Sequence, residues 1–189
     1  MPSRILLVSG SLRRDSHNTK LLRAAAELLP PGTEHELVDA GVLKAVPPYS
    51  EDDDAGERPA AVVALRRAIE RADGVLFSTP EYNGSIPGQL KNALDWVSRP
   101  VATTALRGKP VAVVGASTSL FGAVWAQAEL RKVLATIGAK VVDRELPVMH
   151  AQERFGEEGE LVDHELRTEL AAHVAALVEA IGEPAVVAA

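Results

Sequence analysis

The distribution of apolar residues along the chain predicts strands that alternate with helices. Continuous apolar runs bounded by polar residues are typical of strands buried on both faces of a parallel sheet. We expect such strands at residues 4–10, 73–79 and 108–117. A short strand is expected at 35–40, where it could form an edge of the sheet, and a last strand at 139–143.

Apolar residues spaced three or four positions apart predict five helices between these strands. The helices are expected at residues 18–29, 60–72, 87–99, 124–138 and 163–182. Residues 41–59 show no clear period and end in prolines, acidic residues and a glycine, so we expect a long loop there. Its acidic run at 51–54 is typical of a solvated surface.

The repeated succession of strand and helix determines the expected fold class. It predicts a parallel sheet covered by helices on both faces, and right-handed crossovers make this a three-layer α/β sandwich. A chain of 189 residues is long enough for one sizeable core, so we expect a single domain over residues 1–189.

Charge and composition exclude several classes of function. A net charge of −6 argues against a general binder of nucleic acid or of anionic membranes. With no cysteine, the chain has no disulfide, no thiolate metal site and no thiol nucleophile. No segment reaches the length of a membrane span or a signal peptide, so we expect a cytoplasmic protein.

The loop after the first strand, "SGSLRRDSHNTK" (9–20), carries the chemistry of a phosphate site. Ser11, Arg13, Ser16 and Asn18 gather at the start of a helix, where unpaired N–H groups and the helix dipole favour an anion. The alternative is that Ser16 or Asn18 only caps the helix. The loop has one glycine where a dinucleotide motif needs three, and it lacks the paired Gly-Lys-Ser/Thr of a P-loop, which favours the phosphate of a mononucleotide.

Two further loops are expected at the same edge of the sheet. "TPEYNGSIPG" (79–88) is rich in proline and glycine, which gives a loop a defined shape, and "GASTSLFGA" (115–123) follows the fourth strand. Their backbone groups and the aromatic face of Tyr82 suit a flat heterocycle. From the residues alone, Glu81 is explained equally well as a ligand contact or as a solvated carboxylate. Tyr82 is explained equally well as a ligand contact or as a packing residue.

Three motifs, taken together, are similar to those of a known protein family. "GSLRRDSHN", "PEYNGSIPGQLKNALDW" and "GAS…AQAELRKVL" resemble the NAD(P)H-dependent FMN reductases of the flavodoxin-like fold, over about residues 4–148. That family includes quinone, chromate and azo-dye reductases. The resemblance implies five parallel strands in the order 2-1-3-4-5.

The resemblance also assigns residues to the cofactor FMN. It implies that the side chains of Ser11, Arg13, Ser16 and Asn18, with the main chain of His17, hold the phosphate. It implies that the isoalloxazine lies against Pro80, Glu81, Tyr82, Asn83 and Gly84, with Ser117 on the other side.

The implied activity is hydride transfer from NADPH or NADH to bound FMN, followed by reduction of a quinone, chromate, azo-dye or flavin acceptor. The cofactor carries this chemistry, so no protein nucleophile is expected. The five histidines are scattered without the pattern of a triad or a metal site, and His173 is expected to be a surface or flanking residue. The alternatives are a flavodoxin-like electron carrier and a module that senses a phosphorylated ligand.

Two aromatic features bear on the acceptor and on assembly. Many relatives have a glycine pair and an arginine after the serine of the third loop, whereas this chain reads "FGAVW", with Phe121 and Trp125. In helix 87–99, Leu90, Ala93, Leu94 and Val97 face the sheet, and Trp96 points away from them. Trp96 is therefore either a flank of the core or an interface anchor; we expect a homodimer or homotetramer with Trp96 near the contact.

Overall fold

Among the residues that the structure describes, six parallel strands form the central sheet. The structure is a computed structural model that describes residues 3–38, 40–54 and 56–182. Its strands are β1 (Arg4–Ser9), β2 (Glu34–Leu37), β3 (Gly74–Thr79), β4 (Pro110–Ala116), β5 (Lys140–Val141) and β6 (Pro147–Val148). They lie in the order β2-β1-β3-β4-β5, with β6 also paired to β4, so the predicted order is confirmed.

The outer strand next to β4 is broken into two short pieces. Val111 of β4 pairs with Val141 of β5, and Gly115 of β4 pairs with Pro147 of β6. The outer chain therefore uses more residues than β4 over the same length of sheet. The buried side chain of Gln127 stabilises this break, because its Oε1 accepts a hydrogen bond from the Leu146 N–H at 3.2 Å. The predicted strand at 139–143 is thus shorter than expected, and β6 was not predicted.

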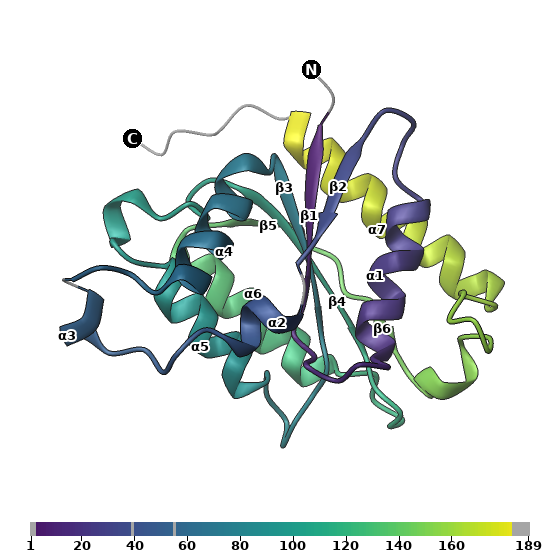
Figure 1. The fold of residues 1–189 in the computed structure, drawn as a ribbon. Helices are drawn as coiled ribbons and strands as arrows, with labels where there is room; N and C mark the ends of the chain where they lie inside the picture. The colour runs from purple at the N-terminus through teal and green to yellow at the C-terminus, as the bar shows by residue number, and fades with distance from the viewer. Residues whose placement is uncertain (1–2, 39, 55, 183–189) are drawn as a thin grey trace.

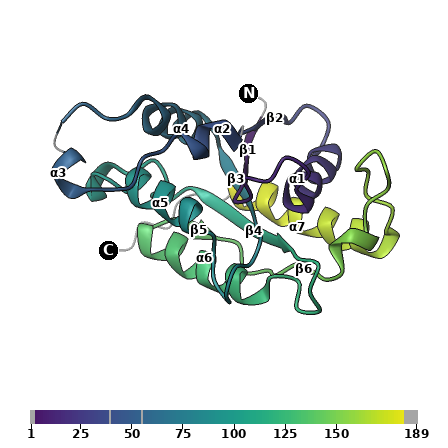
Figure 2. The same ribbon diagram turned by 60° about the horizontal axis from the view of Figure 1, so that its bottom comes forward.

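Helices cover both faces of the sheet (Figures 1 and 2). One face carries α1 (His17–Glu27) and α7 (His164–Gly182), and the other carries α4 (Ala60–Arg71), α5 (Gly88–Val97) and α6 (Val124–Ile137). The three-layer sandwich is therefore confirmed. Short helical segments complete the described chain: α2 (Ala40–Lys44), α3 (Glu51–Asp54), η1 (Val101–Thr103) and η2 (Ala151–Glu153). Within the described residues, no helix has the length and apolarity needed to span a bilayer.

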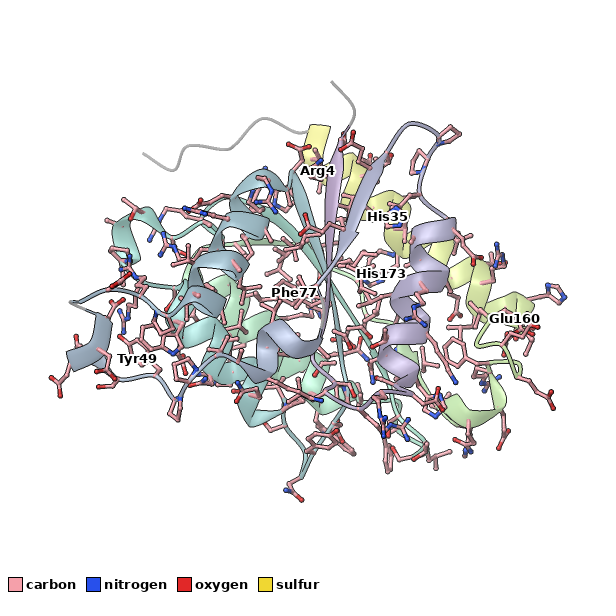
Figure 3. All side chains as sticks on the ribbon, viewed as in Figure 1. Arg4, His35, Tyr49, Phe77, Glu160 and His173 are labelled. Atoms are coloured by element: carbon pink, nitrogen blue, oxygen red, sulfur yellow. The ribbon has the colours of Figure 1, made fainter. Side chains whose placement is uncertain are left out.

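The strands divide the core into two apolar clusters because successive side chains point to opposite faces. In β1, Leu6 and Val8 pack on the side of α4, α5 and α6, whereas Ile5 and Leu7 pack on the side of α1 and α7. Figure 3 shows Phe77 of β3 on the former side. Burial on both faces explains why these strands read as continuous apolar runs in the sequence.

The segment 41–59 differs from the loop that we expected. It contains most of α2 and all of α3, and residue 55 lies outside the described residues. Its first half is held against α5: Gln89 Nε2 donates to the Val46 carbonyl at 2.8 Å, and the Tyr49 N–H donates to Asn92 Oδ1 at 2.7 Å. In the same region β2 ends at Leu37, and residue 39 of the predicted strand 35–40 lies outside the described residues.

The expectation that Trp96 serves as an exposed interface anchor was wrong. Its side chain is only 1% exposed and packs in a small cluster with Val46 and Val62. The indole Nε1 donates to the Pro47 carbonyl at 2.9 Å, and the Tyr49 ring meets the indole edge-on at 5.1 Å. Trp96 points away from the sheet, as predicted, but the segment 41–59 covers it.

The expectation for His173 was also wrong. The imidazole is 1% exposed and lies between the sheet and α7 (Figure 3). Burial, reinforced by the positive charges of Arg144 and Arg131, lowers its pKa to about 4 despite a hydrogen bond to the backbone of Val113. His173 is therefore a neutral core residue at neutral pH.

Candidate functional site

A cavity of about 250 Å³ lies where β1, β3 and β4 end, at the carboxyl edge of the sheet. Three loops that are far apart in sequence meet there, as expected for parallel strands. Its lining residues are Ser11, Arg13, Ser16, His17, Asn18, Pro80, Glu81, Tyr82, Ala116, Ser117 and Thr118. All predicted site residues except Asn83 and Gly84 therefore line one cavity.

The first loop leaves β1 by a close approach to β3. The Gly10 N–H donates to the Ser78 carbonyl at 2.8 Å, and a Cβ at Gly10 would lie 2.8 Å from a Leu90 methyl group. A larger residue at this position would therefore require the Leu90 side chain to shift. Ser11 follows directly and is buried, and its hydroxyl accepts a hydrogen bond from the Arg13 N–H at 3.4 Å.

Helix α1 begins at the wall of the cavity. Ser16 is its N-cap, and the Ser16 hydroxyl accepts from the Thr19 N–H at 3.4 Å, so the capping interpretation is confirmed for Ser16. The N–H groups of His17 and Asn18 belong to the first turn and have no intrahelical acceptor. Arg13 is exposed and forms no salt bridge with any described residue. The cavity therefore combines a cation that has no salt-bridge partner among the described residues with the positive end of a helix dipole.

The Asn18 side chain joins three elements of the fold. Its Nδ2 donates to the Ala116 carbonyl at 2.9 Å, and its Oδ1 accepts from the Ala116 N–H at 3.0 Å and from the Ser78 hydroxyl at 2.8 Å. Asn18 is 3% exposed. These bonds occupy most of its amide, so the side chain fixes α1 against β3 and β4 rather than projecting freely into the cavity.

His17 has an unusual environment for a residue that lines a polar cavity. Its ring stacks on Phe155 at 5.9 Å with an interplanar angle of 20°. Burial, followed by the positive charges of Arg13 and Lys20, lowers the pKa of the imidazole, whereas Asp15 opposes this shift. Its Nδ1 is buried and has no hydrogen-bond partner among the described residues. The ring is therefore neutral at neutral pH and retains an unused polar atom.

The second loop forms a tight turn beyond the cavity. The Tyr82 N–H donates to the Ser85 carbonyl at 3.0 Å, and the Ser85 N–H donates back at 3.1 Å. Asn83 and Gly84 occupy the tip with φ of 54° and 73°, the left-handed conformation that these residue types tolerate best. Tyr82 remains 54% exposed. The shape of the loop thus places Tyr82 at the rim and Asn83 and Gly84 outside the lining.

Glu81 connects this loop to α6. One carboxylate oxygen accepts from the Ala126 N–H at 3.1 Å, whereas the N-cap residue Ala123 has no side-chain group to offer. A carboxylate at a helix N-terminus is stabilised by the helix dipole. Glu81 is therefore neither a free solvated carboxylate nor only a backbone contributor.

The third loop is stabilised by its own hydroxyl groups. The Ser119 N–H donates to the Ser117 hydroxyl at 3.1 Å, and the two hydroxyls lie 3.0 Å apart. The Ser117 N–H donates to the Val148 carbonyl of β6 at 3.0 Å. Ala116 and Thr118 line the cavity but were not predicted. Their position beside Ser117 in "GASTSLFGA" was the available signal.

The donor set fits a phosphorylated, planar ligand. The α1 end offers hydroxyls, N–H groups and Arg13, and the opposite end offers Pro80, Tyr82 and the backbone of the third loop. FMN has a phosphate and a flat ring of this kind. Among the described residues, no group of three or more histidine, aspartate or glutamate side chains is placed to hold a metal ion.

Comparisons with known proteins agree with this geometry. A family model described as NADPH-dependent FMN reductase matches residues 3–153. An NAD(P)H-dependent FMN reductase of Pseudomonas aeruginosa is 42% identical over 165 residues, which cover 87% of this chain and 87% of that protein. A 2-hydroxy-1,4-benzoquinone reductase of a Burkholderia species is 41% identical over 168 residues, covering 88% and 90% of the two chains.

Solved structures show the same relationship. FerB, a flavoenzyme NAD(P)H:(acceptor) oxidoreductase from Paracoccus denitrificans, superimposes with a TM-score of 0.81 at 35% identity and covers 95% of this chain and 97% of its own. An archaeal flavodoxin that is 12% identical shares the fold, with a TM-score of 0.65 and coverage of 95% and 99%. The chain therefore belongs to the NADPH-dependent FMN reductase family, and it is an NAD(P)H-dependent flavin oxidoreductase with a flavodoxin-like fold that uses FMN.

Proposed function

We propose that the protein oxidises NAD(P)H and reduces quinones, with chromate, azo dyes and free flavin as secondary acceptors. The observation that carries this proposal is the cavity at the carboxyl edge of the sheet, where the α1 N-terminus faces the loops 79–88 and 115–123. The benzoquinone reductase among the relatives supports a quinone as the main acceptor. The overall reaction transfers a hydride from NAD(P)H and a proton from solvent to a quinone, which becomes a hydroquinone.

The α1 end of the cavity would bind the phosphate of FMN. The hydroxyls of Ser11 and Ser16 and the guanidinium of Arg13 supply side-chain donors, and the first-turn N–H groups of His17 and Asn18 add backbone donors. The side chain of Asn18 contributes by fixing the start of α1 against β3 and β4. The site is thus positioned by the sheet rather than by a flexible loop.

The other end would bind the ring system of FMN, whose chemistry when bound is two-electron transfer between a nicotinamide and an acceptor. Pro80, Glu81 and Tyr82 would line one side and Ser117 the other. Asn83 and Gly84 form the exposed tip of the second loop beside Tyr82, and they remain part of the proposed site. Because Glu81 holds the start of α6, it keeps the second and third loops at a fixed separation.

The catalytic unit in this proposal is a cytoplasmic homodimer or homotetramer, in which the single domain over residues 1–189 repeats. The half-exposed Tyr82 at the rim supports a second wall from another copy, because a flavin site functions best when water is excluded. Trp96 lies inside the fold and takes no part in this contact. Sedimentation at micromolar concentration tests the assembly, and a fully active monomer would contradict it.

Purification followed by turnover measurements tests the function. We expect a yellow protein that releases FMN on denaturation and oxidises NAD(P)H faster with quinones than with chromate, azo dyes or free flavin. A flavin-containing protein that does not oxidise NAD(P)H would be an electron carrier instead. A protein that binds no flavin at saturating FMN would favour the alternative of a module that senses a phosphorylated ligand.

A further inference from the structure

Three aromatic side chains are exposed at the carboxyl edge of the sheet. Tyr82, Phe121 and Trp125 are 54%, 53% and 50% exposed, whereas Phe77, Trp96 and Phe155 are at least nine-tenths buried. The chain has few aromatic residues, 4% in all. Tyr82 lines the cavity, whereas Phe121 and Trp125 lie outside its lining. Exposure of large aromatic groups is unfavourable in water, so their accumulation at one edge of the sheet indicates a binding surface.

Hydrogen bonds connect Phe121 and Trp125 to the loops that line the cavity. The Phe121 N–H donates to the Ser119 hydroxyl at 3.4 Å, and that hydroxyl contacts the Ser117 hydroxyl at 3.0 Å. Trp125 precedes Ala126, whose N–H donates to Glu81. Both aromatic residues therefore belong to the same fixed frame as the cavity lining.

The turn that carries the two rings is rigid. Gly122 has φ of 57°, and a Cβ at this position would lie 2.7 Å from the backbone of Pro147. Ala123 follows with φ of 62° and is fully buried, and Gln127 Nε2 donates to the Gly122 carbonyl at 3.2 Å. The Phe121 and Trp125 rings contact each other at 4.8 Å with a tilt of 53°. The turn therefore keeps this aromatic pair at the surface, where it cannot collapse into the core.

The charge around the pair excludes one class of ligand. Residues 115–128 include no charged side chain. Ionisable residues hydrogen-bonded to this segment include Glu81, through its carboxylate, and His150, through its backbone N–H, which donates to the Ser119 carbonyl at 3.2 Å. Arg13 lines the cavity, but in the proposed function it is occupied by the cofactor phosphate. An anion approaching Phe121 and Trp125 would therefore meet aromatic faces and the Glu81 carboxylate, and no lysine or arginine of residues 115–128. A flat, uncharged ring would stack favourably on the same surface.

We propose that Phe121 and Trp125 form an acceptor-binding subsite that selects flat, uncharged quinones over anionic acceptors such as chromate. This inference rests on the proposed quinone reductase function and adds the residues that determine its acceptor preference. The occupant is a small ring compound because hydrogen bonds through Ser119 and Ala126 connect the pair to the cavity-lining residues Ser117 and Glu81. A second copy of the chain covering the pair is the competing outcome.

Steady-state kinetics of the FMN-loaded protein test the subsite. The variants are Phe121→Ala and Trp125→Ala, and the quantity measured is kcat/KM for a neutral benzoquinone divided by kcat/KM for chromate. Removal of one stacking ring should lower this ratio about 3- to 10-fold, mainly through KM for the quinone. Leu120→Ala is the matched control, because Leu120 is 61% exposed in the same loop but has no ring. It should leave the ratio unchanged.

A binding measurement gives a readout that does not depend on turnover. Titration of the oxidised holoprotein with the hydroquinone product should show about 3- to 10-fold weaker binding for Trp125→Ala than for wild type and Leu120→Ala. If the wild type reduces quinones but the variants keep the same ratio and the same hydroquinone affinity, the subsite alone is overturned. A fall in sedimenting mass without a change in the ratio would assign the pair to a subunit interface and also overturn it. A wild type that reduces no quinone would overturn the proposed function together with the subsite.

Discussion

The carboxylate of Glu81 accepts a hydrogen bond from the Ala126 N–H at 3.1 Å, so a residue of the second loop caps a helix that begins 43 positions later in the chain. The N-cap position of α6, Ala123, has no side chain that can perform this role. The carboxylate thereby joins two walls of the cavity and satisfies a helix terminus at the same time. Structural support and the shape of the site depend on the same contact.

Replacement of Glu81 should therefore affect stability as well as the site. At saturating FMN, we expect Glu81→Ala to lower the free energy of unfolding in urea by about 0.5–2 kcal/mol, the usual range for a lost helix cap. Glu81→Gln keeps an acceptor oxygen and should retain most of this stability. Equal stability of wild type and Glu81→Ala would show that the capping contact contributes nothing.

Arg13 provides the test of the phosphate assignment. Arg13→Ala removes a cation that has no salt-bridge partner among the described residues, so the apoprotein should unfold at the same urea concentration as wild type. The binding of FMN should weaken by about 1.5–3 kcal/mol, because a charge-assisted hydrogen bond is lost. Arg14→Ala is the control, since Arg14 is exposed next to it but does not line the cavity. Equal FMN affinities of the two variants, measured by fluorescence titration, would contradict the assignment.

Asn18 should behave as a structural residue rather than as a simple phosphate ligand. Asn18→Ala leaves the buried Ser78 hydroxyl and the backbone of Ala116 without their partner. We expect the free energy of unfolding of the apoprotein to fall by about 2–4 kcal/mol, given about 1–3 kcal/mol for each buried polar group left unsatisfied. Urea unfolding without flavin measures this. Unchanged apoprotein stability with a large loss of FMN affinity would return Asn18 to the role of a pure ligand.

Substitution of Trp96 tests whether this residue stabilises the core or a subunit interface. Trp96→Ala opens a cavity beneath the segment 41–59 and should destabilise the fold by about 3–5 kcal/mol. Trp96→Phe keeps an aromatic ring, loses the hydrogen bond to the Pro47 carbonyl and should retain more of the stability. Neither variant should change the sedimenting mass of the protein that remains folded. Dissociation of fully folded Trp96→Phe would place the residue at an interface after all.

His173 should make the fold sensitive to acid. Its pKa is about 4 in the folded protein against 6.5 in the unfolded chain, so the unfolded state binds the proton more readily. The stability associated with the neutral ring is fully present above pH 6.5 and is lost as the pH falls toward 4. At pH 4 the loss is about 2–3 kcal/mol.

A pH series of urea unfolding measures this contribution. His173→Gln removes the titrating group, so its stability should fall less steeply between pH 6.5 and 4 than that of wild type, whatever its stability at pH 7. The carboxylates are the same in both proteins, and their contribution therefore cancels in the difference. Parallel pH profiles would show that the buried imidazole does not cause the acid sensitivity.

The pattern of apolar residues was sufficient to predict the layers of the fold and the loops that form the cavity. β1, β3 and β4 are buried on both faces, so the apolar character of each strand is visible without any partner. Loops that follow parallel strands share one edge of a sheet, which is why hydroxyl, arginine and proline-rich segments could be assigned to one site before their contacts were known. The order of the strands, and the assignment of His17, Pro80, Glu81 and Ser117 to the site, came from the resemblance to a family.

Hydrogen-bond partners that are far apart in the sequence became visible in the three-dimensional packing of the chain. Gln89, Asn92 and Trp96 lie on a second face of α5, and their bonds to residues 46–49 bury a tryptophan that helical periodicity alone left facing outward. The capping of α6 by Glu81 and the bonds of Asn18 to Ser78 and Ala116 are of the same kind. Periodicity reports the face of an element on which a residue lies, whereas its partner depends on how distant segments pack, and that information is not contained in local spacing.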